Sequence, residues 1–175
     1  FRSPNTVNAM RVGRSDLQIG LGVVLMFGAT LLVYWPALRG EFLWDDWLNI
    51  VRNPLMGSPT GLRDIWLGRE GVFDYYPLTW TTWWLEWRAW RRDTVGYHLL
   101  NVVLHAGAAA FIWRVLVRLA LPGAFFAALA FALHPVNVES VAWITERKNT
   151  LSMFLLAAAV ALYLESVGNP RRFAR

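Results

Sequence analysis

The chain of 175 residues is 56% hydrophobic, 15% aromatic and only 17% charged, with a mean hydropathy of +0.34, and this composition excludes an ordinary soluble domain. It contains no cysteine, so disulfides, thiol catalysis and thiolate metal sites are excluded as well. The net charge of +5 comes from arginines that flank the apolar segments, which argues against a nucleic-acid partner and indicates a lipid bilayer.

The first apolar run predicts a membrane-spanning helix. Residues 17–38 carry no charge, and about 20 apolar residues suffice to cross about 30 Å of hydrocarbon. A cleaved signal peptide is the alternative, but its apolar region covers roughly 7 to 15 residues and ends at a small-residue cleavage site. Neither property fits this run, so we predict a span.

Three further apolar segments follow, at residues 97–121, 123–136 and 151–167, and we expect about four transmembrane helices. Because Lys and Arg of short loops stay in the cytoplasm, the arginines at both ends of the chain predict cytoplasmic termini. The expected domains are a cytoplasmic tail 1–16, transmembrane helix 1 at 17–38, a first outer loop 39–96, transmembrane helices 2–4 within 97–167 with a short outer loop 135–149, and a cytoplasmic basic tail 168–175.

Two acids directly follow the first span. Asp45 and Asp46 stand side by side in the string Trp44-Asp45-Asp46, at the outer surface of the membrane. Adjacent carboxylates in that position suggest chemistry there. Capping of a short helix at 47–51 is the alternative use of either acid, because Asp is a preferred N-cap residue. Residues 56–61 are expected to form an irregular loop.

An aromatic helix is predicted near the end of the same loop. Its aromatic residues share one helical face, and they are Tyr76, Trp80, Trp83, Trp84, Trp87 and Trp90. Pro77 suits its first turn, and Glu86 and Arg88 are expected on its other sides. We expect this helix to lie in the lipid headgroup region as an interfacial helix. A stripe that faces the core of a folded loop is the alternative.

The third apolar segment is too short to cross the membrane. Residues 123–133 would extend roughly 16 Å at 1.5 Å per residue, so the outer end of this segment is expected to lie below the surface. A polar recess that opens outward is then predicted around His134, Asn137, Glu139, Glu146, Arg147 and Lys148. The alternative for Glu139 is a surface ion pair with Arg147.

Polar residues also occur within the second apolar segment. His98, Asn101 and His105 share one helical face, and we expect hydrogen bonds between helices there rather than a metal site. Arg114 and Arg118 are expected to extend their side chains to the membrane surface.

Three strings of this sequence together resemble a known family. They are His-Pro-Val-Asn-Val-Glu-Ser-Val-Ala-Trp-Ile-Thr-Glu-Arg-Lys-Asn at 134–149, Trp44-Asp45-Asp46, and Tyr75-Tyr76-Pro77-Leu78-Thr79. In these strings the chain resembles the membrane region of the tetratricopeptide-repeat glycosyltransferases, which is similar to the transmembrane and tetratricopeptide-repeat O-mannosyltransferases of the GT-C superfamily. The resemblance runs from about residue 17 to residue 167. It implies an all-α polytopic membrane protein, the N-terminal part of a GT-C-like fold.

The resemblance also implies a reaction. A sugar, with mannose expected, would pass from a polyprenyl-phosphate donor to an acceptor hydroxyl of a protein Ser or Thr, or of a glycan, on the outer face. Asp45 and Asp46 are then the predicted catalytic pair, because a positioned carboxylate can accept the hydroxyl proton. Arg147 and Lys148 are the predicted ligands of the lipid phosphate, whose departure needs nearby positive charge, and Glu139 is predicted to belong to the same substrate- and lipid-phosphate-binding site. No cofactor is predicted, and the need for a divalent metal is open.

The chain differs from the implied family in length. It shows neither the further spans nor the repeats of about 34 residues that the resemblance implies, so we expect a fragment that is inactive alone. A transporter subunit is one alternative, although it would show paired broken helices in internal repeats. A non-catalytic membrane scaffold is another, although it leaves the diacid unexplained. The expected location is a bacterial inner membrane with a periplasmic active face.

Overall fold

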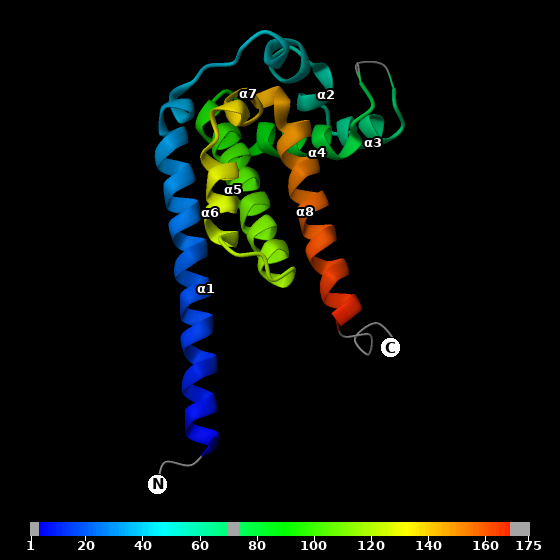
Figure 1. Ribbon diagram of the computed structural model, residues 1–175. Helices are drawn as coiled ribbons and strands as arrows, with labels where there is room; N and C mark the ends of the chain where they lie inside the picture. Colours follow the sequence, from blue (N-terminus) through cyan, green and yellow to red (C-terminus); the bar gives the residue numbers. More distant parts are fainter. Residues whose placement is uncertain (1–3, 70–73, 169–175) are drawn as a thin grey trace.

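The computed structural model describes residues 4–69 and 74–168, and within those ranges the chain is all-α, without strands. The helix α5 (Thr94–Arg118) is central and contacts α1 (Pro4–Tyr34), α6 (Ala124–Leu133) and α8 (Arg147–Gly168). Figure 1 shows that α1 begins and α8 ends toward the same end of the molecule, while the segments between α1 and α5 and between α6 and α8 gather at the other end.

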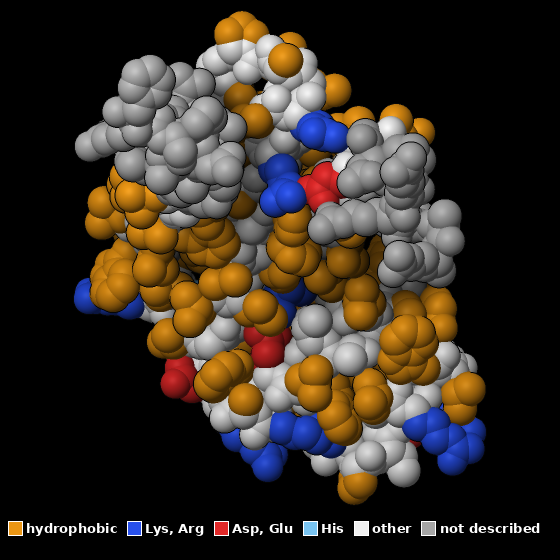
Figure 2. Space-filling view, turned by 90° about the horizontal axis from the view of Figure 1, so that it is seen from below, with side chains coloured by type: hydrophobic (Ala, Val, Ile, Leu, Met, Phe, Trp, Pro, Cys, Tyr) orange, Lys and Arg blue, Asp and Glu red, His pale blue; other side chains and the backbone are white. Residues whose placement is uncertain are grey.

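Among the described residues, three segments are long and apolar enough to cross a membrane, each by itself. They are Leu17–Arg39, Thr94–Arg118 and Ile144–Val167. Figure 2, seen from the end where α8 finishes, shows apolar side chains spread over the described part of this face, with several groups of basic side chains between them. The predicted all-α, multi-pass membrane protein is therefore confirmed. The predicted tail 4–16 continues α1 as helix, and residues 1–3 and 169–175 of the two predicted tails lie outside the described ranges.

The short third segment is a bent helix. After α6 the chain turns by 46° into η3 (Pro135–Asn137) and α7 (Val138–Ala142), so these pieces form either one broken span or a re-entrant loop. Pro135 cannot donate a backbone hydrogen bond, and α6 ends before it. Asn137 Nδ2 instead donates to the carbonyl of Phe131 (2.8 Å), and His134 Nδ1 accepts from the Val136 N–H (3.2 Å).

The first outer loop folds into short helices. These are η2 (Trp47–Val51), α2 (Pro54–Gly57), α3 (Gly61–Trp66) and α4 (Pro77–Trp90). Before them, η1 (Trp35–Arg39) ends the first candidate span, and η4 (Ile144–Glu146) precedes α8 in the second loop. The predicted short helix at 47–51 is confirmed. The irregular loop predicted at 56–61 is wrong at both ends, because α2 includes Met56, which is completely buried, and α3 begins at Gly61. Burial against the rest of the fold outweighs the local preference of Gly, Ser and Pro for turns in this segment.

The middle of the aromatic face of α4 packs against protein, whereas Tyr76 and Trp90 at its two ends are exposed. Trp80 and Trp83 are 1% and 3% exposed and belong to a core that includes Phe42, Ile50, Leu55, Met56, Ile65, Tyr97 and Ile144. This burial favours the core-facing interpretation of the stripe. The opposite face exposes Leu78 and Leu85, and α4 lies across the outer ends of α5 and α8 (Figure 1).

The polar residues of α5 join it to other elements, as predicted. Asn101 Nδ2 donates to the Trp143 carbonyl (2.9 Å), and His105 Nε2 is bonded to the Ala132 carbonyl (3.0 Å). His98 Nε2 lies 3.2 Å from the Gly40 carbonyl oxygen. At the other end of α5, Arg114 forms an ion pair with Glu165 of α8. The expectation that Arg114 extends to the membrane surface did not include this pair.

Candidate functional site

The diacid lies in a tight turn. The N–H of Asp46 donates to the carbonyl of Leu43 (2.7 Å), and Trp44, between them, has a positive φ of 35°. The Asp46 carboxylate also closes the turn, because its Oδ2 accepts from the Leu43 N–H (2.9 Å). The turn therefore holds Asp45 and Trp44 at the surface, where both side chains are exposed.

Asp46 joins the two outer loops. It is only 1% exposed, and its Oδ1 accepts from the N–H of Thr145 (2.9 Å), which lies in the second outer loop. No hydrogen bond from its side chain caps η2, so the capping alternative is wrong for Asp46. Burial raises the pKa of this carboxyl above its ordinary value, while the hydrogen bonds from Leu43 and Thr145 act in the opposite direction.

Asp45 differs from Asp46 in its exposure and in its hydrogen bonding. It is exposed, and within the described ranges no hydrogen bond or ion pair occupies its carboxylate. A carboxylate that is free to meet solvent can accept a proton from an incoming hydroxyl. The two adjacent acids are therefore not equivalent, since one is exposed and the other is fixed inside the protein.

Arg147 is completely buried and uses all its donors within the chain. Its Nη1 and Nη2 donate to the two oxygens of Glu86 (2.8 and 3.1 Å). The remaining N–H groups donate to Thr82 Oγ1 (3.1 Å), the Tyr97 carbonyl (2.8 Å) and Asn101 Oδ1. A guanidinium has five N–H donors, so none remains for a lipid phosphate in this geometry. The predicted alternative pairing of Arg147 with Glu139 is wrong, because Glu86 is its partner.

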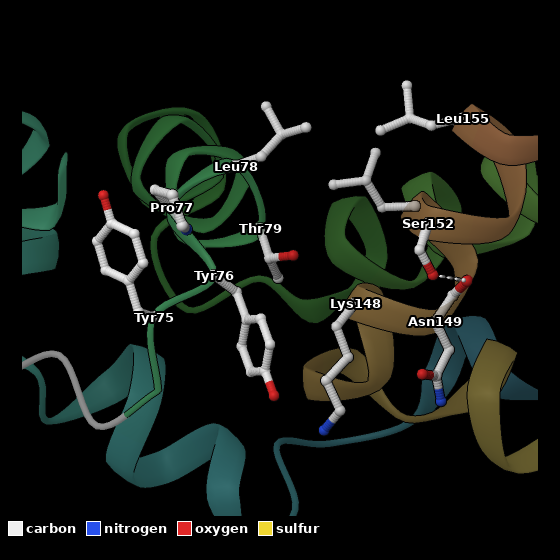
Figure 3. Close-up of a pocket in the computed structure, with 10 residues that line it drawn as sticks. Tyr75, Tyr76, Pro77, Leu78, Thr79, Lys148, Asn149, Ser152 and Leu155 are labelled. Carbon is white, nitrogen blue, oxygen red and sulfur yellow. Dashed lines mark hydrogen bonds between the residues drawn. The ribbon is translucent and has the colours of Figure 1, made fainter. Parts of the chain in front are cut away.

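Lys148 points elsewhere, into a cavity of about 500 Å³ between α4 and α8. The walls are Tyr75, Tyr76, Pro77, Leu78 and Thr79 on one side, and Lys148, Asn149, Leu151, Ser152 and Leu155 on the other. Lys148 Nζ is 2.8 Å from Glu146 Oε1, and its side chain is 40% exposed. Figure 3 shows the polar ends of Tyr76, Lys148 and Asn149 at one end of the cavity and Leu78 and Leu155 at the other.

The cavity unites two of the strings that carry the family resemblance. Tyr75 to Thr79 come from the first outer loop, and Lys148 and Asn149 come from the end of the second. The third string, with Asp46, reaches the same segment through Thr145. Glu139 and His134 lie exposed on and beside α7, and a site role for Glu139 stays a prediction.

The sequence did not predict the partners of Arg147 and Asp46, which are Glu86 and Thr145. Glu86 was expected on a polar side of α4, yet it is 6% exposed and lies on the buried face with Trp83. Its position three residues after Trp83 was the available signal, because residues three apart share a helical face. Thr145 contributes through its backbone N–H, which no side-chain pattern reveals.

Comparison with known proteins gives several relatives. Protein O-mannosyl-transferase F38B6.6 of Caenorhabditis elegans is 30% identical over 159 residues, which cover 82% of this chain and 23% of that protein. Protein O-mannosyl-transferases TMTC1 and TMTC3 of Mus musculus are each 32% identical, covering 82% and 83% of this chain and 17% of each relative. The chain thus spans about a fifth of the length of the curated relatives it matches. No family model matches the chain, and no solved structure matches it either.

Breaking the buried ion pair should destabilise the protein strongly. We expect Glu86→Gln to lower the free energy of unfolding by about 3–5 kcal/mol, because Arg147 then keeps a buried charge without its counter-ion. Unfolding in mixed micelles by SDS titration measures this. The matched control is Arg69→Gln, which removes the exposed pair with Asp64 and should cost at most about 1 kcal/mol. Equal losses in the two variants would contradict the central role of the buried pair.

The raised pKa of Asp46 predicts a pH dependence of stability. Because the folded protein binds this proton more tightly than the unfolded chain, the stabilisation is present below the ordinary pKa of 3.8. It is lost as the pH rises from 3.8 through the raised value. Asp46→Asn should remove this part of the slope, and thermal unfolding across that pH range measures it. Glu41→Gln, an exposed acid of the same loop, should keep the slope, and an unchanged slope in Asp46→Asn would contradict the assignment.

Proposed function

Since this chain is, over most of its own length, a homologue of the transmembrane and tetratricopeptide-repeat protein O-mannosyltransferases, we propose that it forms part of a membrane-bound glycosyltransferase. The relatives are named for transfer of mannose to protein. The proposed reaction is transfer of mannose from a polyprenyl-phosphate donor to a protein Ser or Thr hydroxyl at the outer face of the membrane, in a GT-C-type site. The matched relatives named above are animal proteins, so the bacterial inner-membrane location stays a prediction.

One observation carries this proposal. The Asp46–Thr145 hydrogen bond of 2.9 Å holds the turn that bears Asp45 against the segment that leads into Lys148. This bond supports the proposal because the candidate base and the candidate phosphate ligand belong to two loops that are separate in the sequence and are joined by it. Transfer from a lipid phosphate needs both groups, one for the attacking hydroxyl and one for the leaving phosphate.

The proposed step is a substitution at the anomeric carbon of the donor sugar. The acceptor oxygen forms a bond to that carbon while Asp45 takes the hydroxyl proton. The bond between the anomeric carbon and the phosphate oxygen breaks, and the polyprenyl phosphate leaves with the bonding electrons. Lys148 stabilises the negative charge that develops on the phosphate, since a preorganised cation in a partly enclosed cavity interacts strongly with developing charge.

The shape of the cavity supports a lipid-linked donor. Its polar end carries Lys148, Asn149 and the Tyr76 hydroxyl, and its other end is lined by Leu78 and Leu155 (Figure 3). Leu151 also lines the cavity. Leu151 and Leu155 follow Lys148 along α8 toward the interior of the proposed span, which is Ile144–Val167. A phosphate at Lys148 could therefore continue into an isoprenoid tail along the apolar face of α8.

Arg147 and Asp46 are assigned positioning roles. Arg147 fixes the start of α8 against α4 and α5, and Asp46 fixes the turn that presents Asp45. This assignment replaces phosphate binding by Arg147, because its five donors are already used. Phosphate binding is retained for Lys148 alone among the cations of the second loop.

The two acids should respond differently to substitution. Asp45→Asn is expected to lower transfer of labelled mannose by about 10²- to 10⁴-fold without loss of thermal stability, because it removes a general base from an exposed site. Asp46→Asn is expected to lower both transfer and stability, because one amide N–H group would face the backbone donor of Leu43 or Thr145. The measurement uses membranes that contain the full-length gene product at matched abundance.

Glu41→Gln is the control, since Glu41 is an exposed acid of the same loop. Equal transfer by wild type and Asp45→Asn would remove Asp45 as the base. No transfer by wild type would refute this donor and favour the scaffold or transporter interpretations.

Substitution of Lys148 should act on the donor. We expect Lys148→Gln to raise the KM for polyprenyl-phosphate mannose by about 10- to 100-fold, the equivalent of one hydrogen bond to a charged group of about 1.5–3 kcal/mol. The KM for the acceptor should not change. Lys148→Arg should recover part of the loss, and Arg92→Gln, which removes an exposed cation after α4, should have no effect. An unchanged donor KM in Lys148→Gln would show that the phosphate binds elsewhere.

A further inference from the structure

Trp44 combines a bulky side chain with a backbone conformation that suits small residues. Its φ of +35° places it in the left-handed half of conformational space, at the second position of the turn closed by Leu43 and Asp46. Turns with positive φ at that position are dominated by Gly, Asn and Asp. A bulky residue in such a conformation is strained, and strained residues cluster at active sites and ligand clamps.

Burial does not compensate for this strain. Trp44 is 75% exposed, and its ring contacts Trp143 edge to face, with ring centroids 5.3 Å apart. Trp143 belongs to the second outer loop, where Asn101 fixes its carbonyl. The indole is thus oriented by a neighbour while most of its surface stays accessible, as contact with a ligand would require.

The position of Trp44 indicates which ligand. It directly precedes Asp45 in the same turn and both side chains are exposed, so an acceptor whose hydroxyl meets Asp45 comes close to the residue that bears the indole. The donor cavity with Lys148 is built from other elements, α4 and α8. A rigid, flat indole offers apolar contact to an extended polypeptide and requires little ordering on binding.

We propose that Trp44 is a contact residue for the acceptor polypeptide, and that the strained turn is retained because it presents this ring beside Asp45. This inference rests on the proposed function and adds the acceptor side of the site. It also explains why a residue that destabilises the turn occupies this position.

The test is Trp44→Asn in the full-length gene product, because Asn tolerates a positive φ and relieves the strain. With a synthetic, uncharged Ser/Thr-rich peptide as the acceptor, we expect its KM to rise about tenfold, an effect typical of one anchor residue. Binding of the same peptide, labelled and followed by fluorescence anisotropy, should weaken by a similar factor. The donor KM should not change, and the Tm should stay equal or rise. Trp66→Asn is the matched control, because Trp66 is a 52% exposed tryptophan on α3.

Three results would overturn the inference. An unchanged acceptor KM and unchanged peptide binding would show that the ring does not contact the acceptor. A rise in the donor KM alone would assign the ring to the sugar of the donor. A lower Tm would make Trp44 a packing residue that other parts of the full-length product cover. Absence of transfer by wild type refutes the proposed function instead, and peptide binding then still decides whether Trp44 contacts a polypeptide.

Discussion

The buried ion pair between Glu86 and Arg147 holds the candidate site together. Both side chains are almost completely inaccessible, and the guanidinium is bonded to α4 and α5 while its backbone begins α8. A buried charge without its partner is costly, so this geometry constrains the relative positions of three helices. Since Arg147 lies between Thr145 and the cavity-lining Lys148, the same constraint positions both loops of the candidate site.

The division between Asp45 and Asp46 follows from this arrangement. Asp46 needs a backbone donor from the second loop, and Thr145 supplies it only when the start of α8 is fixed. With Asp46 held inside, the turn must present Asp45 and Trp44 outward, and it does so at the expense of a positive φ at Trp44. Positioning and chemistry are thus separated between two neighbouring acids, because Asp46 is buried, which raises its pKa, whereas Asp45 is exposed.

Much of the architecture follows from local sequence, whereas the site depends on distant contacts. The uncharged run at 17–38 predicts a span, and the spacing of Trp80, Trp83 and Trp87 predicts one face of a helix. Periodicity does not reveal what covers that face, and here protein covers it. Nor could adjacent, identical acids be told apart from sequence, because the partner of Asp46 lies 99 residues away and that of Glu86 lies 61 residues away.

The two outer loops act as one unit through the buried pair of Glu86 and Arg147. Hydrogen exchange of the full-length gene product in micelles, wild type beside Glu86→Gln, tests this most directly. The account predicts faster exchange at the amides of Leu43 and Thr145, which are bonded to Asp46 and not to Glu86. Faster exchange confined to α4, with Leu43 and Thr145 unchanged, would contradict it.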